Sequence, residues 1–386
     1  MAAPFFGGTM NHYHNSYFKV NMPTVMRNFD KVRAYVGPDV EVIPVVKGNC
    51  YGYGSIAMAK LYQDHLGVKL IANSAVYEAV ELREAGITCD LLIIGGIPQH
   101  LLDGVIKYDL QMPLFDETTA RRVQELASAA GKRVKVHIKI ETGMNRLGVR
   151  GGKDLENLLK LVKSLDSIEI VGAYTHFATS TADFDEPFAL KQYARFKEAV
   201  QQIRDFGIDL QYIHCCNSAA IAWFKDAYCT HVRSCSSVLG HMAMEDGREP
   251  IGLEEPCEIG AFITNIHEVS PGETIGYSRA YQVQRPMKVA TLSIGFADGF
   301  YPKWMRGGGP VLVSGVKTKF LGCCMDQSFV DVTGIDCQIG DRALLIGRDG
   351  DERITTWDME QFCENTFEYL YGTIGQRVER IYSWEE

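Results

Sequence analysis

One lysine follows an apolar run and is placed to do covalent chemistry. The run at 42–46 contains valine, isoleucine and proline, and it predicts a short buried strand. Lys47 comes directly after it, before Gly48 and Asn49. The carboxyl ends of such strands carry the functional groups of α/β proteins. A primary amine between apolar walls has a lowered pKa and can form a Schiff base. A lysine that simply reaches water is the alternative, and the strand alone does not exclude it.

Other reactive side chains occupy equivalent places after later strands. They come at or just after the predicted strand ends: Tyr51, Lys139, Arg146, His176, Ser218, Arg233, Cys235 and Ser236. A barrel of parallel strands brings these ends to one face. Two lysines, two arginines, a histidine and small hydroxyl groups there suit an anionic, phosphorylated ligand, and Ser218 opens a helix whose amides can cap a phosphate. Each residue has an ordinary structural explanation by itself, but their joint occurrence favours a shared site.

Strands alternate with helices through the first part of the chain. The strand at 42–46 is followed by seven further candidates, at 69–74, 90–95, 110–114, 133–140, 168–175, 212–217 and 230–233. Helical patterns are found at 22–35, 56–65, 75–85, 117–130, 154–164 and 188–206. Eight strands that alternate with helices over about 200 residues predict a parallel (β/α)8 barrel.

The pattern changes from about Ile251 onward. Short β-rich runs separated by Gly, Pro and Asp turns lie at 261–269, 287–293, 310–313, 317–321, 329–332 and 342–346, with a helix at 358–363 and a last strand at 377–382. The predicted fold class is α/β, with an N-terminal TIM-like barrel at 14–245 and a C-terminal antiparallel β domain at 246–386. Residues 1–13 form an extension that can associate with the β domain, and 11–18 can add an early strand to it.

Composition narrows the class of protein. The 46% apolar content supports large cores, and the net charge of −9 suggests no nucleic-acid-binding surface. The eleven cysteines lack the paired spacing of a zinc site, so we expect no metal. The start of the chain has no basic region before an apolar stretch, and no run reaches membrane-spanning length. These features predict a cytoplasmic protein without a membrane partner.

Six motifs carry a resemblance to a known family. They are VVKGNCYGYG at 45–54, ETGMNRLG at 141–148, NSAA at 217–220, IGYS at 275–278, IGFADG at 294–299 and CMDQ at 324–327. With these motifs in this order, the sequence resembles the alanine racemase family, the fold-type III pyridoxal phosphate (PLP) enzymes. The resemblance extends from about residue 14 to residue 382.

The resemblance implies an amino-acid racemase, an isomerase that interconverts L- and D-alanine. Lys47 would hold PLP covalently. Removing a proton from one face and returning it on the other requires two bases. The resemblance assigns Lys47 to the D-isomer and Tyr277 to the L-isomer, with Tyr277 supplied by the partner subunit of a homodimer with shared sites. Tyrosine has an ordinary pKa of about 10, so it needs nearby cations, for which the resemblance offers His176 and Arg233.

The resemblance also assigns the remaining site residues. Arg233 faces the pyridine nitrogen, Arg146 contacts the PLP phenolic oxygen and the substrate carboxylate, and the Met325 amide binds that carboxylate. Lys139 matches a lysine that is carbamylated in many members. The full cofactor-binding set is Lys47, Tyr51, His176, Ser218, Arg233, Cys235, Ser236 and Gln376.

Two departures from the family pattern leave alternatives open. Cys235 and Ser236 stand where a Gly-Ile pair is usual, and Cys235 cannot adopt every backbone conformation of glycine. Gln376 replaces a tyrosine that narrows the substrate entry, so serine or a broader set of amino acids remains an alternative substrate. A non-catalytic PLP-binding protein is a further alternative, although such proteins lack the β domain. A decarboxylase or aldolase is another, and Arg233 argues against the decarboxylase.

Overall fold

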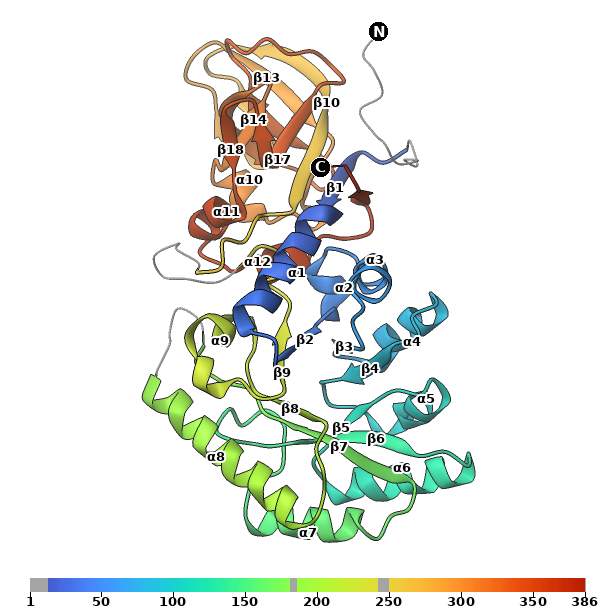
Figure 1. Cartoon of the computed structure of the whole chain (residues 1–386). Coiled ribbons are helices and arrows are strands. Elements are labelled where there is room, and N and C mark those ends of the chain that lie inside the picture. The colour runs from blue at the N-terminus through green and yellow to red at the C-terminus, as the bar shows by residue number, and fades with distance from the viewer. Residues whose placement is uncertain (1–12, 181–185, 242–249, 386) are drawn as a thin grey trace. The chain divides into compact units, whose positions relative to one another are not determined.

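The chain forms two compact units in a computed structural model that describes residues 13–180, 186–241 and 250–385 (Figure 1). The barrel unit comprises Met26–Cys50 and Ser55–Leu253. The β unit comprises the described residues up to Val25, together with Tyr51–Gly54 and the chain from Glu254 onward. The β unit includes the first strand, because that strand pairs with strands of the C-terminal half. The domain bounds at 14–245 and 246–386 stay a prediction.

Eight parallel strands close the barrel unit, as predicted. They are β2 (Glu41–Pro44), β3 (Leu70–Asn73), β4 (Asp90–Ile93), β5 (Met112–Leu114), β6 (Val134–Lys139), β7 (Ile168–Tyr174), β8 (Tyr212–His214) and β9 (His231–Ser234). Six of them form one sheet in the order β2-β9-β8-β7-β6-β5, and β3 pairs with β4. Parallel bridges between Val45 and Ala72 and between Leu92 and Gln111 join the two sheets. The ring is closed, so its carboxyl ends share one face.

Helices connect successive strands of the barrel and lie outside it (Figure 1). They are α4 (Val76–Glu84), α5 (Leu102–Lys107), α6 (Glu117–Ala129), α7 (Lys153–Val162), α8 (Glu186–Asp205) and α9 (Ser218–Trp223), preceded in the chain by α1 (Met22–Val36), α2 (Lys47–Tyr51) and α3 (Ser55–Lys60). In α7 the buried residues are Leu155, Leu158, Leu159 and Val162, one apolar stripe at helical spacing. The predicted strand at 212–217 ends early, at His214, because the Asn217 side chain caps α9 by accepting from Ala220 N–H at 3.0 Å.

Six antiparallel strands close a second ring in the β unit, which confirms the predicted antiparallel β domain. They are β10 (Cys257–Val269), β13 (Met287–Leu292), β16 (Ser328–Asp331), β15 (Val316–Cys323), β14 (Pro310–Val313) and β17 (Arg342–Asp349), and β17 returns to pair with β10. The early strand is β1 (Ser16–Asn21), which pairs antiparallel with β10 and parallel with β19 (Glu379–Ser383). Residues 1–12 lie outside the described residues, so the role of the extension stays a prediction.

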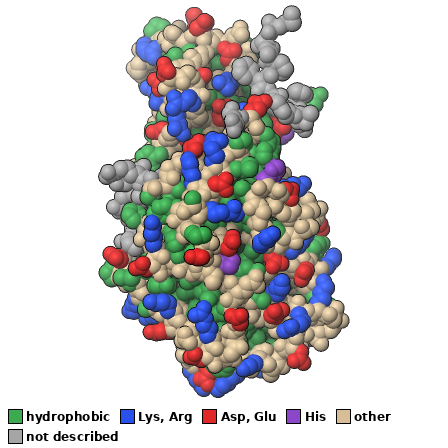
Figure 2. Space-filling view, viewed as in Figure 1, with side chains coloured by type: hydrophobic (Ala, Val, Ile, Leu, Met, Phe, Trp, Pro, Cys, Tyr) green, Lys and Arg blue, Asp and Glu red, His purple; other side chains and the backbone are tan. Residues whose placement is uncertain are grey.

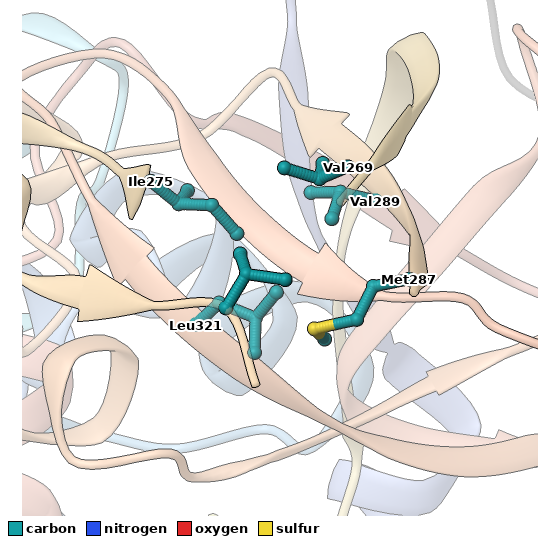
Figure 3. Close-up of a cluster of buried hydrophobic side chains, with 6 residues drawn as sticks. Val269, Ile275, Met287, Val289 and Leu321 are labelled. Atoms are coloured by element: carbon teal, nitrogen blue, oxygen red, sulfur yellow. The ribbon is translucent and has the colours of Figure 1, made fainter. Parts of the chain in front are cut away.

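A compact hydrophobic cluster supports one short hairpin of the β unit. Its buried members are Val269, Ile275, Val283, Met287, Val289 and Leu321. Figure 3 shows Ile275 directed toward Leu321. Ile275 belongs to β11 (Thr274–Ile275), which pairs with β12 (Tyr281–Gln282). The cluster therefore anchors the base of a hairpin whose loop begins at Gly276.

Short elements complete the β unit. They are η4 (Tyr277–Arg279), η5 (Phe296–Asp298), α10 (Pro302–Arg306), β18 (Glu352–Ile354), α11 (Thr356–Cys363) and α12 (Phe367–Gly372). Acidic and basic side chains alternate over the face seen in Figure 2. Among the described residues, no helix combines the length and the apolar character that a bilayer crossing requires.

Candidate active site

The backbone after β2 turns in an unusual direction and presents Lys47. The next four residues all have left-handed dihedral angles, with φ of 60° at Gly48, 55° at Asn49, 51° at Cys50 and 54° at Tyr51. A left-handed conformation costs an L-residue roughly 1–2 kcal/mol. Such strain persists only where the surroundings over-determine the conformation, and it concentrates at functional sites. The turn therefore marks the end of β2 as a functional position.

A buried carboxylate holds this turn in place. Glu78 of α4 accepts from Gly48 N–H at 2.6 Å through one oxygen. Its other oxygen accepts from Ser74 N–H at 2.9 Å and from Ala75 N–H at 3.2 Å. Asn49 adds a second tie, because its side-chain oxygen accepts from Ser55 N–H at 3.0 Å. Glu78 thus joins the end of β3 to the lysine turn, a role that the sequence analysis missed.

Arg233 lies at the centre of the strand-end residues. Its guanidinium is 3% exposed and donates to five acceptors. Nη1 donates to Nδ1 and to the carbonyl of His214. Nη2 donates to the carbonyls of Thr175 and Cys215. Nη2 also donates to Nδ1 of His176, which lies 3.1 Å away. Because a guanidinium only donates, both histidines must present an unprotonated Nδ1 to it. The arginine is therefore held in one orientation.

Positive charge gathers around His176. Burial lowers the pKa of His176 well below its usual value, and the charges of Arg233, Lys139, Arg146 and Lys47 lower it further. Burial, with Arg233 and Arg146, also lowers the pKa of Lys139 well below its usual value. The Lys139 Nζ lies 4.5 Å from the ring centre of Tyr174. The cationic Arg233 and Arg146, with Lys47 and the buried Lys139 near them, fit an anionic ligand such as a phosphorylated pyridoxal.

Hydroxyl and amide groups lie beside this cationic cluster. Ser218 begins α9, and its Oγ accepts from Cys235 N–H at 2.9 Å. Cys235 is 5% exposed and does not adopt a left-handed φ. A cysteine therefore fits where the family has glycine, and that departure introduces no backbone strain. Ser236 is half-buried and follows directly.

Tyr277 stands at the tip of the hairpin in the β unit. Its side chain is 80% exposed. The loop that carries it is left-handed at Gly276, Ser278 and Arg279, with φ of 77°, 56° and 56°. Ile275 anchors the preceding residue in the hydrophobic cluster. A strained loop on an anchored base therefore holds the phenol outward, and such strain concentrates at functional sites.

Three further predicted residues also lie in the β unit. Met325 is 60% exposed, and its carbonyl accepts from Ala297 N–H at 2.7 Å. A Cβ at Gly295 would lie 2.5 Å from that carbonyl, so only glycine allows this approach. The Tyr51 ring stacks on Phe367 at 5.9 Å, and Gln376 is exposed.

The structure therefore groups the predicted residues in two sets. The barrel set is Lys47, Lys139, Arg146, His176, Ser218, Arg233, Cys235 and Ser236, and the set in the β unit is Tyr51, Tyr277, Met325 and Gln376. Two residues that hold this site, Glu78 and His214, were not predicted from the sequence. In the sequence, His214 stands out only as a polar residue inside an apolar strand. Glu78 stands out only as an acidic residue within a helix.

A (β/α)8 barrel with a strand-end lysine and a following antiparallel β domain defines a class of PLP-dependent amino-acid racemases, which are isomerases. Two family models match the chain, "Alanine racemase, N-terminal domain" over residues 20–242 and "Alanine racemase, C-terminal domain" over residues 257–382. The chain belongs to the alanine racemase family.

Curated relatives and solved structures agree with this assignment. The chain is 33% identical over 366 residues to alanine racemase 2 of Caldanaerobacter subterraneus, covering 94% of each chain. It is 35% identical over 367 residues to alanine racemase of Halothermothrix orenii, covering 94% of this chain and 96% of that relative.

Among solved structures, alanine racemase of Clostridium difficile superposes with a TM-score of 0.90 at 27% identity, covering 96% of each chain. Alanine racemase of Bacillus anthracis with bound L-Ala-P also superposes with a TM-score of 0.90, at 29% identity, covering 99% of this chain and 96% of that one.

Proposed function

We propose that the protein interconverts L- and D-alanine, with PLP held on Lys47 and with Lys47 and Tyr277 as the two bases. The observation that carries the proposal is the positive charge that Arg233, Arg146 and Lys47 place around His176 at the barrel face that holds Lys47. The names of the relatives, all alanine racemases, support alanine as the substrate. Bound PLP supplies an electron sink that makes the Cα proton of an amino acid removable.

The residues of the chain divide the remaining tasks. Lys47 removes or returns the proton on the face of the D-isomer. Arg233, always protonated, would offer a donor to the pyridine nitrogen and so leave that nitrogen without a proton. Arg146 binds the substrate carboxylate by a charge-assisted hydrogen bond, with the Met325 amide as a further donor. Ser218 at the start of α9 and Cys235 and Ser236 after Arg233 would hold the phosphate.

Tyr277 is the base for the L-isomer, and each subunit of a homodimer supplies its Tyr277 to the site of the other subunit. Its 80% exposure and the 60% exposure of Met325 support this assignment, because a general base must be within hydrogen-bond reach of its proton and shielded from water. A second copy of the chain that covers both residues would shield them. A twofold dimer forms two such shared sites at once.

Mixed dimers test this assignment. Lys47→Ala and Tyr277→Phe chains with different tags are co-expressed, and dimers that carry both tags are purified. If Tyr277 acts across the dimer, the mixed dimer has one intact site and roughly half of wild-type racemisation. If Tyr277 acts within its own chain, the mixed dimer is inactive.

A mirrored control uses the same substitutions on one chain. A Lys47→Ala/Tyr277→Phe chain paired with a wild-type chain has no intact shared site, so it should be inactive. Half activity in this control, or a protein that is monomeric throughout, contradicts the shared site. A protein that binds PLP yet exchanges no Cα proton of any amino acid contradicts racemisation itself.

We also propose that Lys139 is carbamylated. Its lowered pKa favours the neutral amine, and the amine adds to CO2 to give a carbamate with release of one proton. The product is an anion beside Arg146, which it can orient. Carbon-13 NMR of protein equilibrated with labelled bicarbonate should show one carbamate signal that is lost in Lys139→Ala. Equal signals in both proteins contradict the modification.

Serine, or a broader set of amino acids, is the second candidate substrate. The observation that favours it is Gln376, an exposed polar side chain where the family has tyrosine. The flanking residues are fixed by Asp298, which accepts from Arg377 Nε at 2.8 Å and from Gly375 N–H at 3.0 Å. A racemisation screen across the common amino acids, repeated with Gln376→Tyr, decides between the candidates. A serine-to-alanine rate ratio unchanged by Gln376→Tyr contradicts a role for Gln376.

A further inference from the structure

A line of hydrogen bonds leads from Arg233 into the barrel interior. Arg233 Nη1 lies 2.7 Å from Nδ1 of His214. Nε2 of His214 lies 3.2 Å from Nδ1 of His137. Nε2 of His137 lies 2.8 Å from Oε1 of Gln111, whose Nε2 donates to Oδ2 of Asp90 at 2.8 Å. Five side chains in or beside different strands are thus connected in one series, which we call the interior relay.

The interior relay runs lengthwise through the barrel. Asp90 begins β4 and Gln111 directly precedes β5, whereas His214 ends β8 and Arg233 is the last residue but one of β9. Because all strands are parallel, the relay starts near their amino ends and finishes at the face that holds the site. The four inner members are 0–3% exposed, and Asp90 is partly exposed.

The groups at the two ends of the relay fix which nitrogen of each histidine carries the proton. At one end the Arg233 guanidinium can only donate, so His214 Nδ1 accepts and its proton resides on Nε2. That proton makes Nδ1 of His137 an acceptor. At the other end the Asp90 carboxylate can only accept, so the Gln111 amide nitrogen faces it and the amide oxygen faces His137. The two constraints agree at His137, which carries its proton on Nε2.

We propose that His137 and Gln111 are positioning residues for Arg233, acting by holding His214 in the tautomer whose lone pair faces the guanidinium. A reversed relay would direct a His214 N–H at the Arg233 N–H groups. Two donors would then face each other, which leaves buried groups unpaired. The Arg233 guanidinium would then lose its hydrogen bond to His214 and leave its present orientation. The inference rests on the proposed role of Arg233 at the pyridine nitrogen.

The packing around the two histidines supports this role. The Tyr212 ring stacks on His137 at 5.1 Å, and the Tyr174 ring stacks on His214 at 4.9 Å. A Cβ at Gly172 would lie 2.5 Å from Nδ1 of His137, so a glycine makes room for that ring. Burial lowers the pKa of His137 to about 3 and the pKa of His214 well below its usual value. Both rings are therefore neutral near pH 7, as a relay with one proton per imidazole requires.

The test is Gln111→Met in the full-length holoenzyme with ¹⁵N-labelled histidine. Methionine has a similar volume but removes the acceptor of His137 and the donor to Asp90. In the wild type we expect the assigned signals of both His137 and His214 to show the Nε2–H tautomer by NMR. In Gln111→Met we expect one or both to populate the Nδ1–H form. We also expect a shifted absorbance band of bound PLP and cofactor affinity weaker by roughly tenfold, since outer partners of functional histidines are worth about 10- to 100-fold at metal sites.

A matched control separates positioning from folding. Gln63→Met removes a glutamine in the same unit whose side chain accepts from Thr88 and Cys89 N–H groups, outside the relay. It should leave the tautomers and the PLP band unchanged. If Gln111→Met does not fold, Asp90→Asn serves instead, because this partly exposed position can be changed at low cost and asparagine no longer imposes a direction.

Two outcomes overturn the relay. One is a His214 Nδ1–H signal in the wild type. The other is a Gln111→Met protein that is less stable but has the same histidine tautomers and the same PLP absorbance band as the wild type. The same result in Asp90→Asn, where that variant is used instead, also overturns the relay. The tautomer measurement does not depend on turnover. A protein with the expected tautomers but no racemisation would therefore overturn the proposed function and leave the relay intact.

Discussion

The two sets of proposed site residues differ in how they are held. In the barrel unit, Arg233 is 3% and Lys139 is 5% exposed, and Arg233 donates to five acceptors. In the β unit, Tyr277 is 80% and Met325 is 60% exposed, and a strained loop holds Tyr277 outward. Arg233 is thus integrated into the hydrogen bonding of its own unit. Tyr277 and Met325 are held by their backbone, and their exposed side chains contribute little to the fold.

This difference predicts that activity and stability separate between the two units. A buried polar group contributes to both, because its removal leaves other buried groups unpaired. An exposed side chain can be essential to the reaction and nearly irrelevant to folding. The following changes test that separation, starting with the largest expected effect.

Tyr277→Phe should abolish most activity without affecting stability. Removing a general base costs about a hundred- to ten-thousand-fold in rate. The loss should be larger for proton abstraction from L-alanine than from D-alanine, measured as solvent deuterium uptake from each isomer. The melting temperature should not change. Tyr369→Phe, an exposed tyrosine of the same unit, is the control and should keep wild-type rates. Equal losses from both isomers would contradict the assignment of Tyr277 to the L-isomer.

Arg233→Ala should destabilise the protein, and Met325→Ala should not. Loss of the guanidinium leaves the Thr175 and Cys215 carbonyls and the His214 ring without their donor, which costs roughly 2–4 kcal/mol. Met325 is exposed, so its truncation should change the free energy of unfolding by less than about 0.5 kcal/mol. Urea denaturation measures both. Similar losses of stability in the two variants would remove the distinction between the units.

Glu78→Gln should loosen the lysine turn. A glutamine has one oxygen where the carboxylate uses two, toward Gly48 on one side and toward Ser74 and Ala75 on the other. We expect a loss of about 1–3 kcal/mol in unfolding free energy. Hydrogen exchange at the Gly48 amide should become faster. Glu81→Gln, on the exposed face of the same helix, is the matched control. An unchanged Gly48 amide in Glu78→Gln would show that the turn is held by other contacts.

Mild acid should destabilise the barrel through its buried histidines. Burial lowers the pKa of His137 to about 3, whereas an unfolded imidazole has a pKa near 6.5. Below pH 6.5 the unfolded state therefore binds more protons, so stability is complete above pH 6.5 and is lost as the pH falls toward 3. His137 alone should contribute a loss of about 1 kcal/mol between pH 6.5 and 5.5. Its titratable neighbours are His214, His231, Tyr174 and Tyr212.

Urea denaturation at the two pH values measures this loss. It should be smaller in His137→Phe and unchanged in His267→Gln, because His267 is exposed on β10. A pH dependence that is the same in all three proteins would contradict the assignment to His137.

Much of the barrel site could be predicted because it follows strand ends. Runs of β-branched residues define each strand, and the polar residue that ends the run then points to the shared face, as Lys47 and Lys139 do. The partners of these residues could not be predicted. Gly48 and Glu78 are 30 positions apart, and His137 and His214 are 77 apart, so no local pattern joins them.

The sequence by itself determined the order of strands and helices, the separate β domain and the family, because periodicity and contiguous motifs are local properties of a chain. Only the tertiary structure decided which unit holds β1, which carboxylate holds the lysine turn, and which way the protons of the interior relay point. Those features depend on contacts between distant residues in a closed barrel, where a buried polar group must find its partner wherever the fold brings one.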